Sequence, residues 1–224
     1  MMTIDALMRG KVKRTQQIAL AINDLTAHSR KVGLMTTAFA SELGMPQDEA
    51  NHLGLCAVFH DVGKLIVPVD ILLKPGKLTE QEYSIIKGHP LTGSKILLDI
   101  FGNDAMMSRV ALQHHERYHQ HGYPMRLEAA PIDTQIVAAC DCLEAMTSQR
   151  PYKDAMDFQT AYNMVSREAC GPFHPDVMIG LCSDAVYSRL RAVYLGLERP
   201  SKEWLRSLDT YTQSFIKGYS DREE

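Results

Sequence analysis

Apolar residues recur every three or four positions along most of the chain, the spacing of one face of an α-helix. Alternating apolar and polar runs, which are typical of half-buried strands, are nearly absent. The pattern therefore predicts an all-α fold. We expect one or two helices within residues 1–29, one amphipathic helix in the tail, and further helices over residues 30–43, from 46 to the His-Asp pair at 60–61, and over 79–89, 91–100, 104–115, 133–147, 157–169 and 175–194.

Local signals indicate where helices end and loops begin. Thr79 with Glu82 three residues later is a capping-box signature for a helix start. Gly63 indicates that the helix carrying the His-Asp pair stops there. We expect extended or loop-like chain after Lys64 through Pro68, and residues 116–131 form the long polar loop of the sequence.

Composition and charge exclude several classes of protein. A formal net charge of −3 over 224 residues gives no electrostatic case for binding a nucleic-acid polymer or an anionic membrane. No apolar run approaches the ~20 residues that span a bilayer, and residues 1–13 lack the apolar segment of a signal peptide. The five cysteines form no C-x-x-C pair, so we expect buried free thiols. We predict a single domain in the reducing cytoplasm.

The candidate chemistry centres on His60 and Asp61, which follow an apolar run and therefore end a mostly buried helix. Burying an imidazole beside a carboxylate is unfavourable unless a partner satisfies both groups. A single His-Asp pair is more often hydrogen bonded than metal bound. Here, however, the pair belongs to an ordered set of metal-ligating residue types: His28, His60, Asp61, His89, His114, His115 and Asp141.

The spacing of this set fits a helical bundle. Successive candidates on different elements are 25 to 32 residues apart, about one helical hairpin each, so several helices can direct ligands to one point. Five imidazoles and two carboxylates exceed the needs of one divalent ion and suit two ions bridged by one carboxylate, for which we predict Asp61. Mixed nitrogen and oxygen ligands favour iron, manganese, nickel or zinc over magnesium or calcium.

A site for two metal ions predicts an enzyme that acts on phosphoryl groups. A hydroxide held between two metals is a strong nucleophile at neutral pH, and both metals can accept charge from a phosphoryl oxygen. Lys64, one helical turn after His60, is placed to neutralise a phosphate or to protonate its leaving oxygen. We therefore predict Asp61 and Lys64 as catalytic groups. We expect the remaining histidines to be ordinary core, surface or loop residues, the last without an evident partner: His52, His119, His121 and His174.

Several motifs together resemble a known family. His-Asp-Val-Gly-Lys at 60–64, Leu-Leu-Lys-Pro-Gly-Lys-Leu-Thr at 72–79 and Ile-Lys-Gly-His-Pro at 86–90 are similar to bacterial HD-GYP phosphodiesterase domains. The loop at 114–124 resembles the HHExxDGxGYP signature of that family, and residues 141–153 resemble its later block. The resemblance implies a helical HD domain over most of the chain, with an extension at 1–14, the domain at 15–192 and a helical tail at 193–224.

The same resemblance implies a site and a reaction. The seven residues of the ordered set would bind two divalent transition-metal ions, iron or manganese, and Asp24 stands near a position where some members carry a ligand for a third. Tyr123, Arg150 and Lys153 would bind the substrate, since two cationic side chains suit its two phosphates. The implied reaction is hydrolysis of cyclic di-GMP to linear pGpG, and onward to GMP.

Two positions depart from the family pattern. The chain has His119-Gln120 where Asp-Gly is expected in the loop, and Glu144 where the later block carries an aspartate. Neither change removes a ligand of the ordered set. We expect the first to alter loop shape, substrate choice or partner docking. We expect Glu144, which shares a helix face with Asp141, to orient a metal ligand.

Three alternatives remain open from the sequence. The substrate is another cyclic dinucleotide such as cyclic GMP-AMP, or the chain is a general nucleotide phosphohydrolase. The Lys-Pro-Gly and Gly-Tyr-Pro segments argue against the general enzyme. In the third alternative the altered loop binds a diguanylate cyclase or a sensory protein with little turnover. The tail around Trp204 would then assist docking, or mediate a homodimer.

Overall fold

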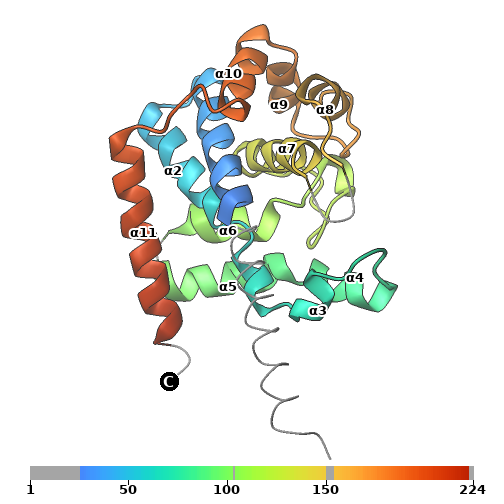
Figure 1. Cartoon of the computed structure of the whole chain (residues 1–224), viewed down its shortest axis with the longest axis vertical. Helices are drawn as coiled ribbons and strands as arrows, with labels where there is room; N and C mark the ends of the chain where they lie inside the picture. The colour runs from blue at the N-terminus through green and yellow to red at the C-terminus, as the bar shows by residue number, and fades with distance from the viewer. Residues whose placement is uncertain (1–25, 103, 150–153, 222–224) are drawn as a thin grey trace, which may run out of the picture.

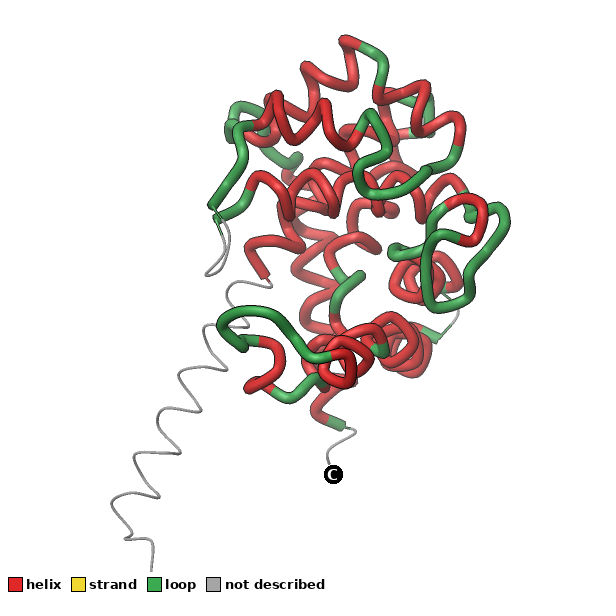
Figure 2. The backbone as a smooth tube through the Cα atoms, turned by 90° about the vertical axis from the view of Figure 1, so that its right-hand side faces the viewer, coloured by secondary structure: helices red, strands yellow, loops and turns green. Residues whose placement is uncertain are grey.

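The computed structural model describes residues 26–102, 104–149 and 154–221. Over these ranges all regular structure is helical, which confirms the predicted all-α fold (Figure 2). None of the helices in this part of the chain has the length and apolar character needed to cross a membrane. After a helix over residues 26–42, the elements are α2 (Gln47–Val58), η1 (Val62–Ile66), α3 (Val69–Leu72), α4 (Glu80–Lys87), α5 (His89–Phe101), α6 (Ala105–Gln113), η2 (Tyr118–Gln120), α7 (Ile132–Thr147), α8 (Phe158–Val165), α9 (Pro175–Leu181), α10 (Asp184–Tyr194) and α11 (Lys202–Ser220).

The core lies where the first helix, α2, α6 and α7 meet (Figure 1). Phe39, Leu53, Val110 and Leu143 come from these four helices and are at most 1% exposed. Burying one such side chain contributes roughly 2 kcal/mol of transfer free energy. This packing fixes the helix ends that carry the candidate ligands.

The chain around His60 and Asp61 differs from the prediction. α2 ends before the pair, and the short 3₁₀ helix η1 replaces the expected extended chain. Gly63 does not stop a helix; a Cβ added there would lie 2.0 Å from the His89 carbonyl oxygen and 2.6 Å from the Gly93 nitrogen. Glycine is needed because η1 lies backbone to backbone on α5, which brings the His-Asp pair beside His89.

Helix caps account for several boundaries. The Thr79 capping box is confirmed: its hydroxyl accepts from the Glu82 amide at 3.2 Å, and the Glu82 carboxylate accepts from the Thr79 amide at 2.8 Å. His174 caps α9, because its Nδ1 accepts from the Asp176 amide at 3.1 Å. The expectation that His174 lacks a partner was therefore wrong. Its sequence signal is Pro175, which favours the first position of a helix.

The predicted helix over 175–194 is two helices. α9 ends at Leu181, and α10 begins at Asp184 after the N-cap residue Ser183. Serine and aspartate favour helix starts over helix interiors, which explains the break. α8 is also shorter than the predicted 157–169, since Asp157 is its N-cap and it ends at Val165.

The tail forms the single amphipathic helix predicted for it. α11 runs beside α2 and α5 (Figure 1), and its Trp204 is 2% exposed. Ser201 caps α11 by accepting from the Trp204 amide at 3.0 Å.

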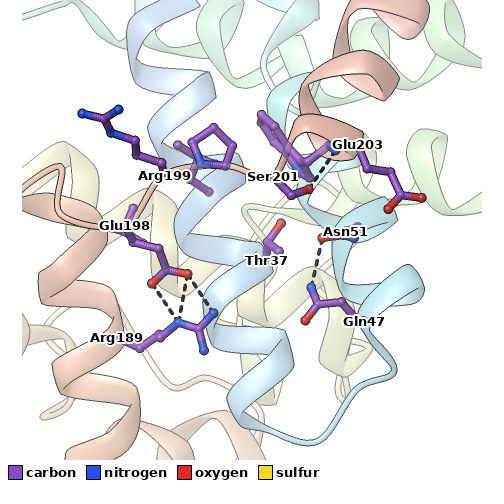
Figure 3. A pocket seen from close by; sticks show the side chains of 12 residues that line it. Thr37, Gln47, Asn51, Arg189, Glu198, Arg199, Ser201 and Glu203 are labelled. Atoms are coloured by element: carbon purple, nitrogen blue, oxygen red, sulfur yellow. Dashed lines mark hydrogen bonds and ion pairs between the residues drawn. The ribbon is translucent and has the colours of Figure 1, made fainter.

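A cavity of about 330 Å³ adjoins Trp204. Figure 3 shows its lining, in which Arg189 donates to Glu198 at 2.7–2.9 Å. Arg189 also donates to Glu42 at 2.9 Å, and this ion pair links α10 to the first helix.

Candidate metal centre

Three candidate histidines are oriented in the same way. His60 follows the end of α2, His89 follows the end of α4, and His114 follows the end of α6. In each case Nδ1 lies near the carbonyl oxygen three residues earlier, at 2.6 Å, 2.7 Å and 2.9 Å respectively. Carbonyl groups in the last turn of a helix lack intrahelical partners and readily accept a hydrogen bond from a ring N–H.

This arrangement sets the tautomer of each ring. With the proton on Nδ1, the lone pair of Nε2 faces away from the helix end. A backbone carbonyl on Nδ1 is the usual outer partner of a metal-ligating histidine, since it fixes the ring and raises its basicity. The helix ends therefore orient His60, His89 and His114 so that Nε2 is the candidate donor atom of each ring.

The candidate ligands form two adjoining groups around Asp61. Oδ1 of Asp61 lies 3.1 Å from Nε2 of His89 and 3.6 Å from Nε2 of His114. Oδ2 lies 3.3 Å from Nε2 of His60 and 3.8 Å from Nε2 of His28. The ligand atoms of each group lie within 4.8 Å of one another, and the groups are Asp61, His89, His114 and His115, and His28, His60 and Asp141.

His28 has a different outer partner. Its Nε2 lies 3.2 Å from Asp141 Oδ1, while its Nδ1 contacts a carboxylate oxygen of Glu144. Glu144 is 2% exposed and accepts from the Ser148 hydroxyl on the next turn of α7. Glu144 thus holds His28 from the side opposite Asp141, the orienting contact expected from its helix face.

Burial and charge act in opposite directions on these groups. Burial alone would raise the pKa of Asp61, but the interactions of its carboxylate with His60 and Lys64 outweigh burial and hold that pKa well below its ordinary range. Burial lowers the pKa of His114 to about 4, so this imidazole is neutral at pH 7. Burial would lower the pKa of His28 as well, yet the carboxylates of Asp141 and Glu144 raise it to about 9.

Two features of this geometry fit a divalent cation. Nε2 of His60 and Oδ1 of Asp61 are buried and have no hydrogen-bond partner within the described residues. Nε2 of His89 and Nε2 of His114 face each other at 3.2 Å, although each Nδ1 lies against a backbone carbonyl that favours the proton on that nitrogen. Two lone pairs at that separation repel unless a cation lies between them. The donor set is of the kind that binds divalent metal ions.

The predicted substrate-side residues are only partly within the described chain. Lys64 donates from Nζ to Asp61 Oδ2, and its side chain is 22% exposed. The ring of Tyr123 stacks on His115 with centroids 4.7 Å apart, and burial raises the pKa of its hydroxyl. The proposed third-metal residue and the two predicted phosphate-binding cations lie outside the described residues: Asp24, Arg150 and Lys153.

Glu116, to which the sequence analysis assigns no role, holds the loop after His115 in place. Glu116 is fully buried, and its carboxylate accepts from the amides of Met125, Arg126 and Leu127. A buried carboxylate with three backbone donors is well satisfied, and it anchors the loop that carries Tyr123. Its sequence signal was its position directly after two candidate ligands.

The variant dipeptide of this loop retains an unusual backbone. His119 has φ 55° and Gln120 has φ 62°, the left-handed region that glycine adopts most readily. The chain therefore forms a left-handed turn here without a glycine at position 120. Both side chains contact exposed Glu128, from His119 Nδ1 at 3.1 Å and from Gln120 Nε2 at 3.0 Å.

Comparison with known proteins gives consistent relatives. A sequence model described as the HD domain matches residues 14–177. A cyclic di-GMP phosphodiesterase of Pseudomonas aeruginosa is 35% identical over 178 residues, which are 76% of this chain and 43% of that protein. A 3′3′-cGAMP-specific phosphodiesterase of Vibrio cholerae is 33% identical over 207 residues, which are 91% and 45% of the two chains. This chain thus spans less than half the length of these curated relatives.

A solved structure supports the fold. The HD domain of the L. monocytogenes phosphodiesterase PgpH superposes with a TM-score of 0.57 at 17% identity, over 80% of this chain and 97% of that one. At this identity the likeness concerns the fold alone. The family match covers most of the chain, and the motifs around the two histidine groups agree with it. The chain belongs to the HD domain family, and its motifs and relatives place it among the HD-GYP proteins.

Proposed function

We propose that this protein is a metal-dependent phosphodiesterase that hydrolyses cyclic di-GMP to linear pGpG, and pGpG onward to GMP. The observation that carries the proposal is the position of Asp61, whose two carboxylate oxygens face separate groups of imidazoles. A shared carboxylate of this kind is suited to two neighbouring cations. Relatives named as cyclic di-GMP and cyclic GMP-AMP phosphodiesterases support a cyclic dinucleotide as substrate.

We assign the ligands from the two groups. His89, His114 and His115 with Asp61 Oδ1 would hold one ion, while His28, His60 and Asp141 with Asp61 Oδ2 would hold the other. Imidazole and carboxylate donors suit iron or manganese, and Asp24 is the candidate ligand for a third ion. When bound, two such ions supply a nucleophile at neutral pH and take up negative charge on a phosphoryl oxygen.

The protein's own groups position the substrate. Lys64 contacts Asp61 and retains solvent access, so its ammonium can turn to a phosphate oxygen or donate a proton to the leaving oxygen. Tyr123, held flat against His115, would present its ring edge and hydroxyl beside the same site. Arg150 and Lys153 are proposed to hold the two phosphates of the dinucleotide.

The test is a metal analysis of anaerobically purified protein, with cyclic di-GMP turnover measured on the same sample. We expect about two ions from the paired groups, and loss of both metal and turnover in Asp61→Ala. Asp209→Ala, an exposed carboxylate on α11, is the matched control and should retain both. Protein that contains neither metal nor turnover would contradict the proposal.

One observation favours a second substrate. The relative that matches 91% of this chain is named for cyclic GMP-AMP. The same assay with 3′3′-cyclic GMP-AMP distinguishes the two, because the ratio of kcat/KM values measures the preference directly. Metal together with cyclic GMP-AMP turnover, and without cyclic di-GMP turnover, would assign this second substrate.

The exposed loop offers a role in docking that is separate from hydrolysis. Met125 is 52% exposed at the loop surface, and His119 and His121 are also exposed. We propose this surface as the contact for a diguanylate cyclase. Binding of a purified diguanylate cyclase that survives Asp61→Ala but is lost in Met125→Ser would support it, and equal binding by both variants would exclude it.

A further inference from the structure

A third group of ligand-type side chains lies apart from the two groups around Asp61. His52 and Cys56 are four residues apart on α2 and therefore share one face of that helix. Asp104, the N-cap of α6, faces them from the neighbouring helix. Nε2 of His52 lies 3.7 Å from Cys56 Sγ and 3.2 Å from Asp104 Oδ2.

The geometry does not suit a catalytic relay. In a Cys-His-Asp triad the thiol and the carboxylate contact opposite nitrogens of the imidazole, so that a proton taken on one side is stabilised from the other. Here Cys56 and Asp104 both approach the same nitrogen of His52. The Cys56 side chain is also fully buried, which keeps it from attacking a large substrate.

In a hydrogen-bonded cluster the contact between Cys56 and His52 is weak, because Cys56 and Asp104 share one nitrogen of His52. If Nε2 of His52 carries its proton, it donates to Asp104 and cannot accept from the Cys56 thiol. If Nε2 carries a lone pair, it faces the Asp104 carboxylate without a proton between them. The other oxygen of Asp104 already accepts from the Met107 amide at 3.0 Å. A cation shared by all three side chains would satisfy each of them.

We propose that His52, Cys56 and Asp104 form a mononuclear site for a borderline-soft divalent cation, zinc in particular, that is independent of the binuclear site. A tetrahedral zinc ion places nitrogen and sulfur ligand atoms roughly 3.6 Å apart, and nitrogen and oxygen ligand atoms roughly 3.3 Å apart. The two separations in this group, 3.7 Å and 3.2 Å, are close to these values. Thiolate, imidazole and carboxylate are all zinc ligands.

The surroundings leave room for an open coordination position. A hollow of about 580 Å³ between α2 and α11 is lined by His52 together with Glu203, Ser207 and Tyr211. Of the three proposed ligands His52 lines this hollow, and its side chain is 32% exposed while that of Asp104 is 15% exposed, so a hydrated ion can approach the group from the side of His52. Water would complete the coordination, as it does at zinc sites with three protein ligands.

Binding would release one proton from Cys56. Burial and the nearby carboxylates of Asp104 and Asp133 raise the pKa of the thiol, while Arg109 opposes them. The metal-free group therefore holds a thiol, and the S–H proton passes to solvent as the sulfur–metal bond forms. The bound ion would link α2 to the start of α6, and its ligand His52 lies eight residues before His60 on the chain.

Cobalt(II) is the probe that separates this site from the binuclear site. Cobalt bound by a thiolate gives a sulfur-to-cobalt charge-transfer absorption in the near ultraviolet, and the ligands around Asp61 contain no sulfur. Chelator-treated full-length protein is titrated with Co²⁺ alone. We expect the charge-transfer band in the wild type and in Asp61→Ala, and its loss in Cys56→Ala. Zinc added in equal amount should bleach it.

Further variants make the result independent of folding. Asp104→Asn keeps a good helix N-cap while it removes the charge, and His52→Gln changes a partly exposed side chain. Both should weaken Co²⁺ binding by about tenfold or more, as monitored by the same band. Cys140→Ala and Cys142→Ala remove other thiols and should leave the band unchanged. Absence of the band in the wild type, or its loss in Cys142→Ala, would overturn the proposal.

Discussion

The backbone of Gly63 lies against the carbonyl of His89 so closely that a Cβ on Gly63 would stand 2.0 Å from the His89 oxygen. This contact joins the His-Asp turn to the helix that carries His89. Neither partner can move easily, since both atoms at the contact belong to the backbone. The spacing of the two ligand groups around Asp61 therefore depends on a residue that binds no metal.

Gly63→Ala should damage both stability and metal binding. Overpacking against a fixed backbone costs about 3 kcal/mol, and relief of the clash would displace His89 from Asp61. Denaturant unfolding and metal content measured on the same sample check this. Gly76→Ala is the control, because Gly76 has φ +99° in open space and its replacement should cost only about 1 kcal/mol with metal retained. Equal effects of the two substitutions would contradict the role of the contact.

Glu144→Gln should weaken metal binding without unfolding the protein. The amide preserves the size of the side chain but loses the charge that holds His28 Nδ1. Loss of an outer partner of a metal ligand typically reduces affinity by 10- to 100-fold. Competition with a chromogenic chelator measures this. Glu82→Gln, in the exposed capping box of α4, is the control and should bind metal normally. Unchanged affinity in Glu144→Gln would remove Glu144 from the site.

The convergence of the seven candidate residues could be predicted from residue type and interval. Histidine and aspartate at intervals of one helical hairpin indicated convergence, and Asp61 does face both groups. The tautomer-setting contacts of His60, His89 and His114 could not be predicted, because they require knowing that each helix ends just before its histidine. Gly63 was misjudged for a related reason. In the sequence, a glycine after an apolar run indicates the end of a helix. In the structure, Gly63 instead allows the backbone of α5 to approach closely.

The position of His52 beside Asp104 could not be predicted for a similar reason. Along the chain His52 stands eight residues before His60, and its nearest ligand-type neighbours are Asp48, Glu49 and Cys56. Asp104 completes the group from 52 positions away, which no local pattern reveals. Local helix caps were easier to predict, because the capping box of Thr79 and Glu82 is recognised from a four-residue signature.

The metal-free protein should lose stability as the pH rises from about 6.5 to 9. His28 has its pKa raised from 6.5 to about 9 in the fold, so its stabilising contribution is complete below pH 6.5 and is lost as the pH rises through 9. The expected change is on the order of 3 kcal/mol. Thermal unfolding of chelator-treated protein across this range checks it. His28→Gln should remove the decline, and a decline of equal size in that variant would assign it to another group.

Gln120→Gly should stabilise the protein relative to Gln120→Ala by about 1 kcal/mol. Both substitutions remove the hydrogen bond from Gln120 to Glu128, so their difference isolates the backbone. At φ 62° alanine retains the steric cost of the left-handed conformation, whereas glycine does not. Denaturant midpoints with equal slopes would give the difference directly. If alanine and glycine proved equally stable, the turn in solution would not be left-handed at Gln120, and the loop would have changed its shape together with its sequence.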